Sequence, residues 1–323
     1  MKHLFALLAT ARIANVPSVI SNVMFGALLI GSQWQQQIHM AFTAAIAACL
    51  LYVAGNFFND WHDAAWDREN RPERGIPSGL FPRNTYLFTA LAFTAISLFL
   101  GFSAGILLGA SLTLIVLLVI IYTIIHKKSA YGIWVMGACR AMLYAVGIFS
   151  VHRDSASITQ LLPQAWALRE ISPFFVVIVT PMVGMLCYIA GISLLAKQES
   201  KSQHAEVSLF LPRLLVFLPI VTHGLLFACL LGSKISVLHV LFHALVVFGG
   251  WTYWAVMKER TIGQRVSRLL MGIPLIDGIR ISSALTLTMM DHSVISGSFL
   301  IILTIPLLAF LLAGILQKVA PAS

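Results

Sequence analysis

Residues 59–74 read Asn59-Asp60-Trp61-His62-Asp63-Ala64-Ala65-Trp66-Asp67-Arg68-Glu69-Asn70-Arg71-Pro72-Glu73-Arg74, directly after an apolar segment, 39–58, that can cross a bilayer. On a helix, the oxygen-bearing side chains of this stretch fall within an arc of about 100°. Such oxygens suit a hard cation such as Mg²⁺, which often bridges to a ligand phosphate. We therefore predict a metal site with the ligands Asn59, Asp60, Asp63 and Asp67.

Three arginines follow the aspartates within the same stretch. A planar guanidinium binds phosphate oxygens two at a time, so these side chains suit the phosphate that the metal would bridge to. Prolines at 72 and 77 and glycines at 75 and 79 cannot extend the helix, which predicts an ordered loop over its end. The plainer interpretation is a solvated loop with surface ion pairs. We favour a diphosphate site that includes Arg68, Arg71 and Arg74.

The composition places the chain among polytopic membrane proteins. It is 59% hydrophobic and only 10% charged, with a mean hydropathy of +0.90. Only helices fit spans of this length, so the predicted class is an all-α transmembrane bundle. The net charge of +9 does not indicate nucleic-acid binding, because the basic residues lie between apolar spans rather than in one patch.

The apolar segments predict nine spans in one domain, residues 1–323. Each segment is close to the length needed to cross the hydrocarbon region. A weaker segment, 266–290, carries Asp277 and Arg280 and is either a tenth span or a helix at the interface. The nine expected spans are 12–31, 39–58, 85–103, 106–126, 131–150, 172–195, 210–231, 235–257 and 294–316.

Lysines and arginines gather in alternate connections, after the second, fourth, sixth and eighth spans. Because basic loops stay in the cytoplasm, this pattern places the N-terminus and residues 59–74 on the cytoplasmic side. We expect a multi-pass protein of the bacterial inner (plasma) membrane with its site facing the cytoplasm.

Other polar residues could contribute to such a site. Tyr122 and Lys127 lie at the end of one span, where an interfacial belt with basic flanks is the plainer explanation. Arg140 lies deep in the 131–150 segment, where a cation is costly and faces a cavity or a partner. Asn22 shares a helix face with Asn15, which suits either helix–helix hydrogen bonds or a cavity. Lys197 and Glu199 end the sixth span.

The residues resemble the first signature of the UbiA superfamily of intramembrane prenyltransferases. The matching elements are Asn59-Asp60-x-x-Asp63-x-x-x-Asp67-Arg68 and Asn70-x-Pro72-x-Arg74-x-Ile76-Pro77-Ser78-Gly79. Tyr122 followed by His126-Lys127 is similar to the family's Tyr-x-x-x-Lys-Arg element. The resemblance implies that Asn59, Asp63 and Asp67 hold Mg²⁺ on an isoprenyl diphosphate. It also implies that Tyr122 lies near the reacting carbon and that the diphosphate contacts are Arg68, Arg74 and Lys127.

The chain departs from this family at the second aspartate-rich motif, which usually follows the sixth span and holds a second Mg²⁺. Here that region ends in Lys197-Gln198-Glu199, with one carboxylate. The Asn15-Val-Pro17 start, the Cys139-Arg140 pair and this Lys-x-Glu ending most resemble the EboC-like branch. We hypothesise that Arg140 or Lys197 supplies the charge that a second metal supplies elsewhere.

We predict a Mg²⁺-dependent enzyme that transfers a prenyl group from an isoprenyl diphosphate to an unidentified small-molecule acceptor within the membrane. In this reading Asp63, Asp67, Tyr122 and Arg140 are catalytic. The alternative is a transporter or lipid-binding protein that keeps the fold without the chemistry, because intramembrane charges also mark substrate pathways. CDP-alcohol phosphotransfer is disfavoured, since the chain lacks the Asp-x-x-Asp-Gly-x-x-Ala-Arg pattern which that class requires.

Overall fold

The computed structural model describes residues 1–29, 34–151, 173–199, 210–231, 244–258, 261–290 and 297–320. All regular elements in these ranges are helices. The first half of the chain contains α1 (Lys2–Thr10), η1 (Ile13–Asn15), α2 (Val16–Leu28), α3 (Trp34–His62), α4 (Ala64–Asn70), α5 (Arg83–Ala104), α6 (Ile106–Ile125) and α7 (Gly132–Val151). The second half contains α9 (Pro173–Glu199), α10 (Phe210–Leu231), η2 (Ala244–Gly249), α12 (Gly250–Lys258), α13 (Ile262–Met271), α14 (Ile273–Met290) and α15 (Gly297–Val319).

Five described helices, α3, α5, α6, α7 and α9, are long and apolar enough to cross a membrane. A sixth span forms if α1 and the η1–α2 segment, which meet at an angle of 47°, count as one broken helix. These findings confirm the all-helical membrane architecture. The expected count of nine or ten spans stays a prediction, because part of the later segments lies outside the described residues.

The first span differs from the expected 12–31 segment. The helix already begins at Lys2, breaks after Thr10, and resumes through η1 into α2. At the break, Arg12 adopts a left-handed conformation with φ 46° and ψ 50°. A residue with a Cβ rarely takes this conformation, so the bend fixes the direction of the Arg12 side chain at an energetic cost.

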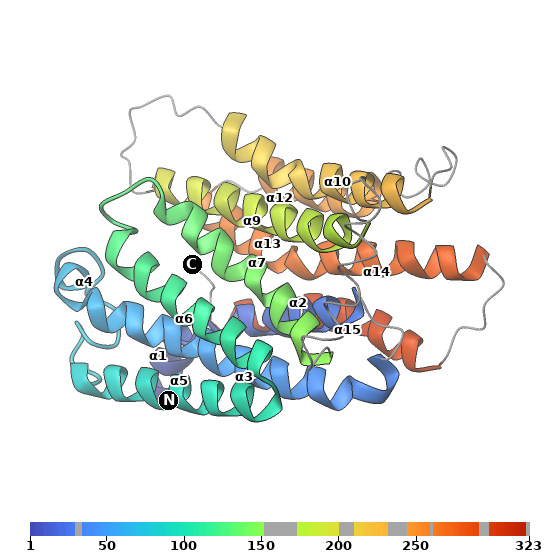
Figure 1. Cartoon of the computed structure of the whole chain (residues 1–323). Coiled ribbons are helices and arrows are strands. Elements are labelled where there is room, and N and C mark those ends of the chain that lie inside the picture. The colour runs from blue at the N-terminus through green and yellow to red at the C-terminus, as the bar shows by residue number, and fades with distance from the viewer. Residues whose placement is uncertain are drawn as a thin grey trace.

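The helices form a bundle in which α7 and α2 run through the middle (Figure 1). On one side lie α3, α5 and α6, and on the other lie α9, α10 and α12. The short helix α4 and the turn between α6 and α7 meet at the same end of the bundle. That end is where residues 59–74 lie.

Two glycines allow α2 and α7 to approach closely. A Cβ added at Gly26 would lie 2.2 Å from the carbonyl oxygen of Tyr144, and one at Gly147 would lie 2.0 Å from that of Val23. Small residues at such positions let membrane helices pack backbone against backbone. This contact brings the polar face of α2 against the middle of α7.

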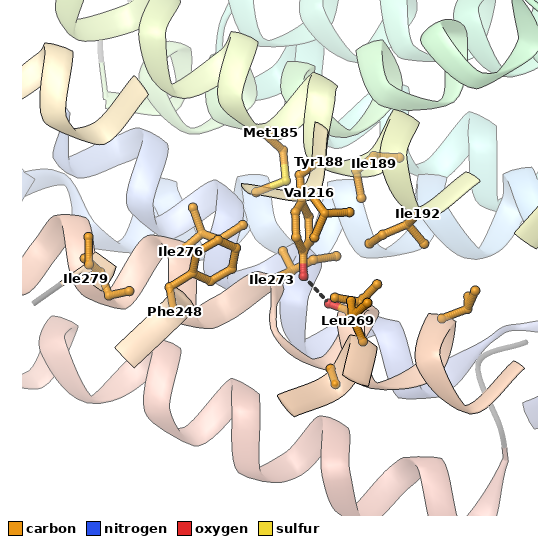
Figure 2. Packing of buried hydrophobic residues seen from close by; sticks show 14 of the residues in the cluster. Met185, Tyr188, Ile189, Ile192, Val216, Phe248, Leu269, Ile273, Ile276 and Ile279 are labelled. Carbon is orange, nitrogen blue, oxygen red and sulfur yellow. Dashed lines mark hydrogen bonds between the residues drawn. The ribbon is translucent and has the colours of Figure 1, made fainter. Parts of the chain in front are cut away.

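The segment expected as one element, 266–290, is two helices that meet at Gly272. The first, α13, begins with a capping box in which Thr261 and Gln264 exchange side-chain and backbone hydrogen bonds. Figure 2 shows the buried apolar cluster at this junction, with Tyr188 of α9 pointing toward it. The Tyr188 hydroxyl donates to the carbonyl of Leu269 at 2.7 Å, so a backbone acceptor near the end of α13 is satisfied inside the core.

Candidate active site

The polar site forms where α3 ends. α3 ends at His62, and α4 begins at Ala64. The helical path continues through the junction, since the Asp63 and Asp67 amides donate to the carbonyls of Asn59 and Asp63, each at 2.9 Å. The one-turn spacing expected from the sequence is therefore kept, although the helix is divided.

Arg74 returns over the helix end and binds two of the aspartates. Its Nη1 lies 2.8 Å from Oδ1 of Asp60 and 2.9 Å from Oδ2 of Asp67. The loop that carries Arg74 turns back through Gly79, the described glycine with a positive φ of 75°. A guanidinium between two buried carboxylates offsets their mutual repulsion.

The third aspartate, Asp63, is paired from another helix. Its Oδ1 lies 2.9 Å from Nζ of Lys127, and its Oδ2 lies 3.2 Å from Nε2 of His126. Burial raises the pKa of a carboxyl, but the hydrogen bonds from His126, Lys127 and His62 outweigh it and hold the pKa of Asp63 well below its usual range. Asp63 is therefore an ionised carboxylate.

The end of α6 is ordered by the same contacts. The His126 ring stacks on Tyr122 at 4.9 Å, and its Nδ1 lies 3.0 Å from the carbonyl of Thr123. The two ring nitrogens of His126 thus face the Thr123 carbonyl and the Asp63 carboxylate. Nζ of Lys127 lies 4.1 Å from the centre of the Trp66 ring on α4. Lys127 therefore lies beside Asp63 and Tyr122 lies beside His126, while the roles that the family resemblance implies for them stay predictions.

The oxygen donors fit a divalent cation of the Mg²⁺ type. The Asn59 amide donates through Nδ2 to Asp63 at 3.3 Å, while its Oδ1 is buried with no hydrogen-bond partner. Among the described residues no three His, Cys, Asp or Glu side chains converge as a closed metal cage. Mg²⁺ does not need one, because it commonly uses one or two carboxylates and completes its shell with water and phosphate oxygens.

Arg12 is a further cation at this site that the sequence interpretation did not assign. Its guanidinium interacts electrostatically with Asp60, Asp63, Tyr122 and Tyr52. The left-handed backbone at Arg12 directs the side chain there. The position of an arginine at the start of an apolar segment was the available sequence signal, and the break in the helix was not visible in it.

The remaining residues that the sequence predicted for the site lie at different distances from the aspartates along the chain and in the fold. Arg68 and Arg71 are exposed on and after α4, close in sequence to the aspartates. Lys197 donates from the end of α9 to the carbonyl of Ser129 at 3.4 Å, which brings it to the turn that follows Lys127. Glu199 is the last residue of α9, and its side chain lies outside the described residues.

The residues described so far form one group, which we name the helix-end cluster. Its members are Arg12, Asn59, Asp60, Asp63, Asp67, Arg74, Tyr122, His126 and Lys127. A second polar group, the inner cluster, lies within the bundle and consists of Ser21, Asn22, Tyr144, Asp277 and Arg280. Asp277 is fully buried and accepts hydrogen bonds from Ser21, Asn22 and Tyr144, each at 2.7 Å. Nη1 of Arg280 donates to the Tyr144 hydroxyl at 3.3 Å.

Asn22 therefore lies in the inner cluster, where it binds Asp277. Arg140 lies between the two clusters. It interacts electrostatically with Tyr52, which is also a neighbour of Arg12, and with Asp277. Its Nη2 donates a hydrogen bond to the hydroxyl of Ser18 on α2. Arg12 thus interacts with the helix-end aspartates Asp60 and Asp63, whereas the carboxylate that interacts with Arg140 is Asp277.

Comparison with known proteins identifies the family. The UbiA prenyltransferase family model matches residues 19–189, a stretch that includes the helix-end aspartates, Arg74, Lys127 and Arg140. The chain belongs to the UbiA prenyltransferase family. The resemblance drawn from Asn59–Gly79 is confirmed, and with it the enzyme class.

Relatives within the UbiA family match this chain at low identity, and the chain covers less than half the length of the first of them. The digeranylgeranylglyceryl phosphate synthase of Ignicoccus hospitalis is 33% identical over 125 residues, covering 38% of this chain and 40% of that protein. That of Saccharolobus solfataricus is 25% identical over 275 residues, covering 83% and 92%. A solved digeranylgeranylglyceryl phosphate synthase shares the fold, with a TM-score of 0.53, 17% identity, and coverage of 88% of this chain and 98% of that one.

Proposed function

We propose that this protein transfers a prenyl group from an isoprenyl diphosphate to an acceptor, in a Mg²⁺-dependent reaction at the helix-end cluster. The observation that carries the proposal is the buried, partnerless Oδ1 of Asn59 beside three aspartates that are paired with the partly exposed side chains of Arg74 and Lys127. Arginine and lysine side chains can exchange a carboxylate for a phosphate, because both offer the same oxygen acceptors.

The leaving group is the diphosphate, so the cations of the cluster act on it. Arg74 and Lys127 bind its oxygens, and Arg68 and Arg71 add charge from the exposed side of α4. Cations aimed at the oxygens stabilise the negative charge that develops as the allylic C–O bond breaks. The electron pair leaves with the diphosphate, and the acceptor then forms its bond to the allylic carbon and releases the proton of the reacting atom to water or to the departed diphosphate.

Asn59, Asp60, Asp63 and Asp67 would hold Mg²⁺, which supplies Lewis-acid stabilisation of the diphosphate when bound. Tyr122, stacked on His126, contributes the face of its ring beside the site, where it shields positive charge on the allylic carbon. Arg12 and Lys197 contribute the charge that a second acidic motif and its metal would supply in the wider family. We further propose that the reaction takes place on the cytoplasmic face of a bacterial inner membrane, because the basic connections favour the cytoplasmic side for residues 59–74.

The relatives' name gives a first acceptor to test. A digeranylgeranylglyceryl phosphate carries two prenyl chains on a glyceryl phosphate, so its synthase adds a chain to a lipid glyceryl phosphate. We take a prenylglyceryl phosphate as the first acceptor to assay for this chain.

The test measures binding of isoprenyl diphosphates of several lengths to the purified protein, with and without Mg²⁺. We expect Mg²⁺-dependent binding in the wild type and its loss in Asp63→Asn, which keeps the shape and removes the charge. Glu69→Gln is the matched control and leaves binding unchanged, because Glu69 is exposed and lies two residues beyond Asp67, the last of the signature aspartates.

If isoprenyl diphosphate binds equally well without Mg²⁺ and to Asp63→Asn, the metal–diphosphate site is refuted. It would favour the second candidate, a transporter or lipid-binding protein with this fold. The observation in favour of that candidate is the set of charged residues buried within the bundle, Arg140, Asp277 and Arg280.

A further inference from the structure

The interior of the bundle carries an unbalanced positive charge. In the described part of the chain, the buried charged residues outside the helix-end cluster are Arg140, Asp277 and Arg280. Two guanidiniums and one carboxylate leave one positive charge in excess. A buried charge without a partner is strongly destabilising, and more so at membrane depth.

The excess positive charge is located at Arg140. Asp277 and Arg280 are joined through the Tyr144 hydroxyl, which accepts from Arg280 and donates to Asp277. Arg140 is 8% exposed, and within the described residues it forms no salt bridge. Its one hydrogen bond is to the Ser18 hydroxyl, and its Nε is buried with no partner.

Ser18 cannot compensate the charge. Its own hydroxyl donates to the carbonyl of Asn15 at 2.6 Å, so it serves as an acceptor for Arg140 and holds the guanidinium in place. A guanidinium has five N–H donors in one plane, and most of those of Arg140 are left for another acceptor. The geometry is that of a positioned cation with no counterion among the residues that the structure describes.

Arg140 also has a suitable position for a second substrate. It lies between Tyr52, which borders Arg12 and the aspartates, and the inner cluster. Along the first span, Ser18 is six residues beyond Arg12 and lies in the first turn of α2, past η1. A donor held at the helix-end cluster would present its allylic carbon next to the diphosphate, so a molecule held at Arg140 lies on the inner side of that carbon.

We propose that Arg140, held by Ser18, binds the anionic head group of the acceptor, a carboxylate or a phosphate carried on an apolar molecule. The inference rests on the proposed prenyl transfer and names the chemical class of its second substrate. The charge of the head group neutralises Arg140, so a neutral acceptor of the same shape leaves the guanidinium uncompensated.

The test uses three probes that share one tail: octyl phosphate, octanoate and 1-octanol. Their binding to purified wild type, Arg140→Gln and Arg140→Lys is measured by calorimetry in a neutral detergent. We expect the wild type to bind the better anion at least roughly tenfold more tightly than the alcohol, as for a hydrogen bond to a charged group. The comparison of phosphate with carboxylate decides between the two head groups.

Arg140→Gln removes this preference for anions, and Arg140→Lys retains part of it. Mg²⁺-dependent binding of isoprenyl diphosphate persists in Arg140→Gln, which separates this inference from the proposed function. Arg83→Gln, a change of an exposed arginine, is the control and leaves both kinds of binding unchanged. Equal affinity of the three probes for the wild type, or an unchanged preference in Arg140→Gln, would overturn the proposal.

A second measurement does not depend on the folding of a variant. An octyl phosphate analogue with a photoreactive group is cross-linked to the wild-type protein, and the labelled peptides are identified by mass spectrometry. We expect labels on α2 and α7 near Ser18 and Arg140, reduced by an excess of unlabelled octyl phosphate. Labels confined to the helix-end cluster or to the lipid-facing surface would refute the site.

Discussion

The helix-end cluster and the inner cluster contain the same residue types, aspartate, arginine and tyrosine, in opposite arrangements. At the helix end, Arg74 and Lys127 approach their aspartates from a loop and from a helix terminus, and both remain partly exposed. In the inner cluster, Asp277 is fully buried and receives three short hydrogen bonds from two helices. The first arrangement can exchange partners with a ligand, whereas in the second the Asp277 carboxylate is already fully engaged and the unpaired atoms are Oδ1 of Asn22 and Nε of Arg280.

This difference shows that polar residues in the bundle have two tasks. The inner cluster joins α2, α7 and α14 and stabilises the fold, because separating its groups would leave them unsatisfied in a medium without water. The helix-end cluster keeps together a set of charges that can receive a metal ion and a diphosphate. Arg140 lies between the two clusters and belongs to neither. We propose that it binds the head group of the acceptor.

The largest expected effect on stability comes from a substitution that disrupts the inner cluster. Asp277→Ala removes the acceptor of Ser21, Asn22 and Tyr144 and the nearby countercharge of Arg280. We expect the free energy of unfolding to fall by about 3–5 kcal/mol, since a buried cation is left alone. The measurement is denaturant unfolding in detergent micelles. Loss of diphosphate binding at unchanged stability would instead make the inner cluster part of the donor site.

A smaller effect is expected from Arg74→Lys. The ammonium group cannot reproduce the planar bridge between Asp60 and Asp67, so we expect turnover to fall about tenfold to a hundredfold with little change in stability. The assay is prenyl transfer at saturating Mg²⁺. Arg83→Lys, the same change at the exposed first residue of α5, is the matched control. Wild-type turnover in Arg74→Lys would show that charge alone suffices there.

The smallest expected effect is that of Trp66→Leu. The Trp66 ring lies against Nζ of Lys127, an interaction worth about 0.5–1 kcal/mol at a partly exposed site. We expect affinity for isoprenyl diphosphate to weaken about two- to fivefold, because Lys127 is then held by Asp63 alone. Trp134→Leu, another exposed tryptophan, is the control. An unchanged affinity would mean that Asp63 by itself positions Lys127.

The sequence by itself determined the membrane class and much of the helix-end cluster. The length of the apolar segments predicts helices, because a single apolar segment of this length crosses a bilayer as a helix. The spacing of Asn59, Asp63 and Asp67 gave one helix face, and it is kept even where α3 and α4 divide. These are local properties that depend on the backbone period and on the solvent, so they can be obtained from neighbouring residues.

Only the tertiary structure decided which distant residues meet. The pairing of Asp63 with Lys127, of Asn22 with Asp277, and of Arg140 with Ser18 joins residues far apart in the chain. The close approach of α2 and α7 at Gly26 and Gly147, and the left-handed backbone at Arg12, bring these groups together. Such contacts follow from packing complementarity among several helices, and no periodic pattern within a single segment encodes them.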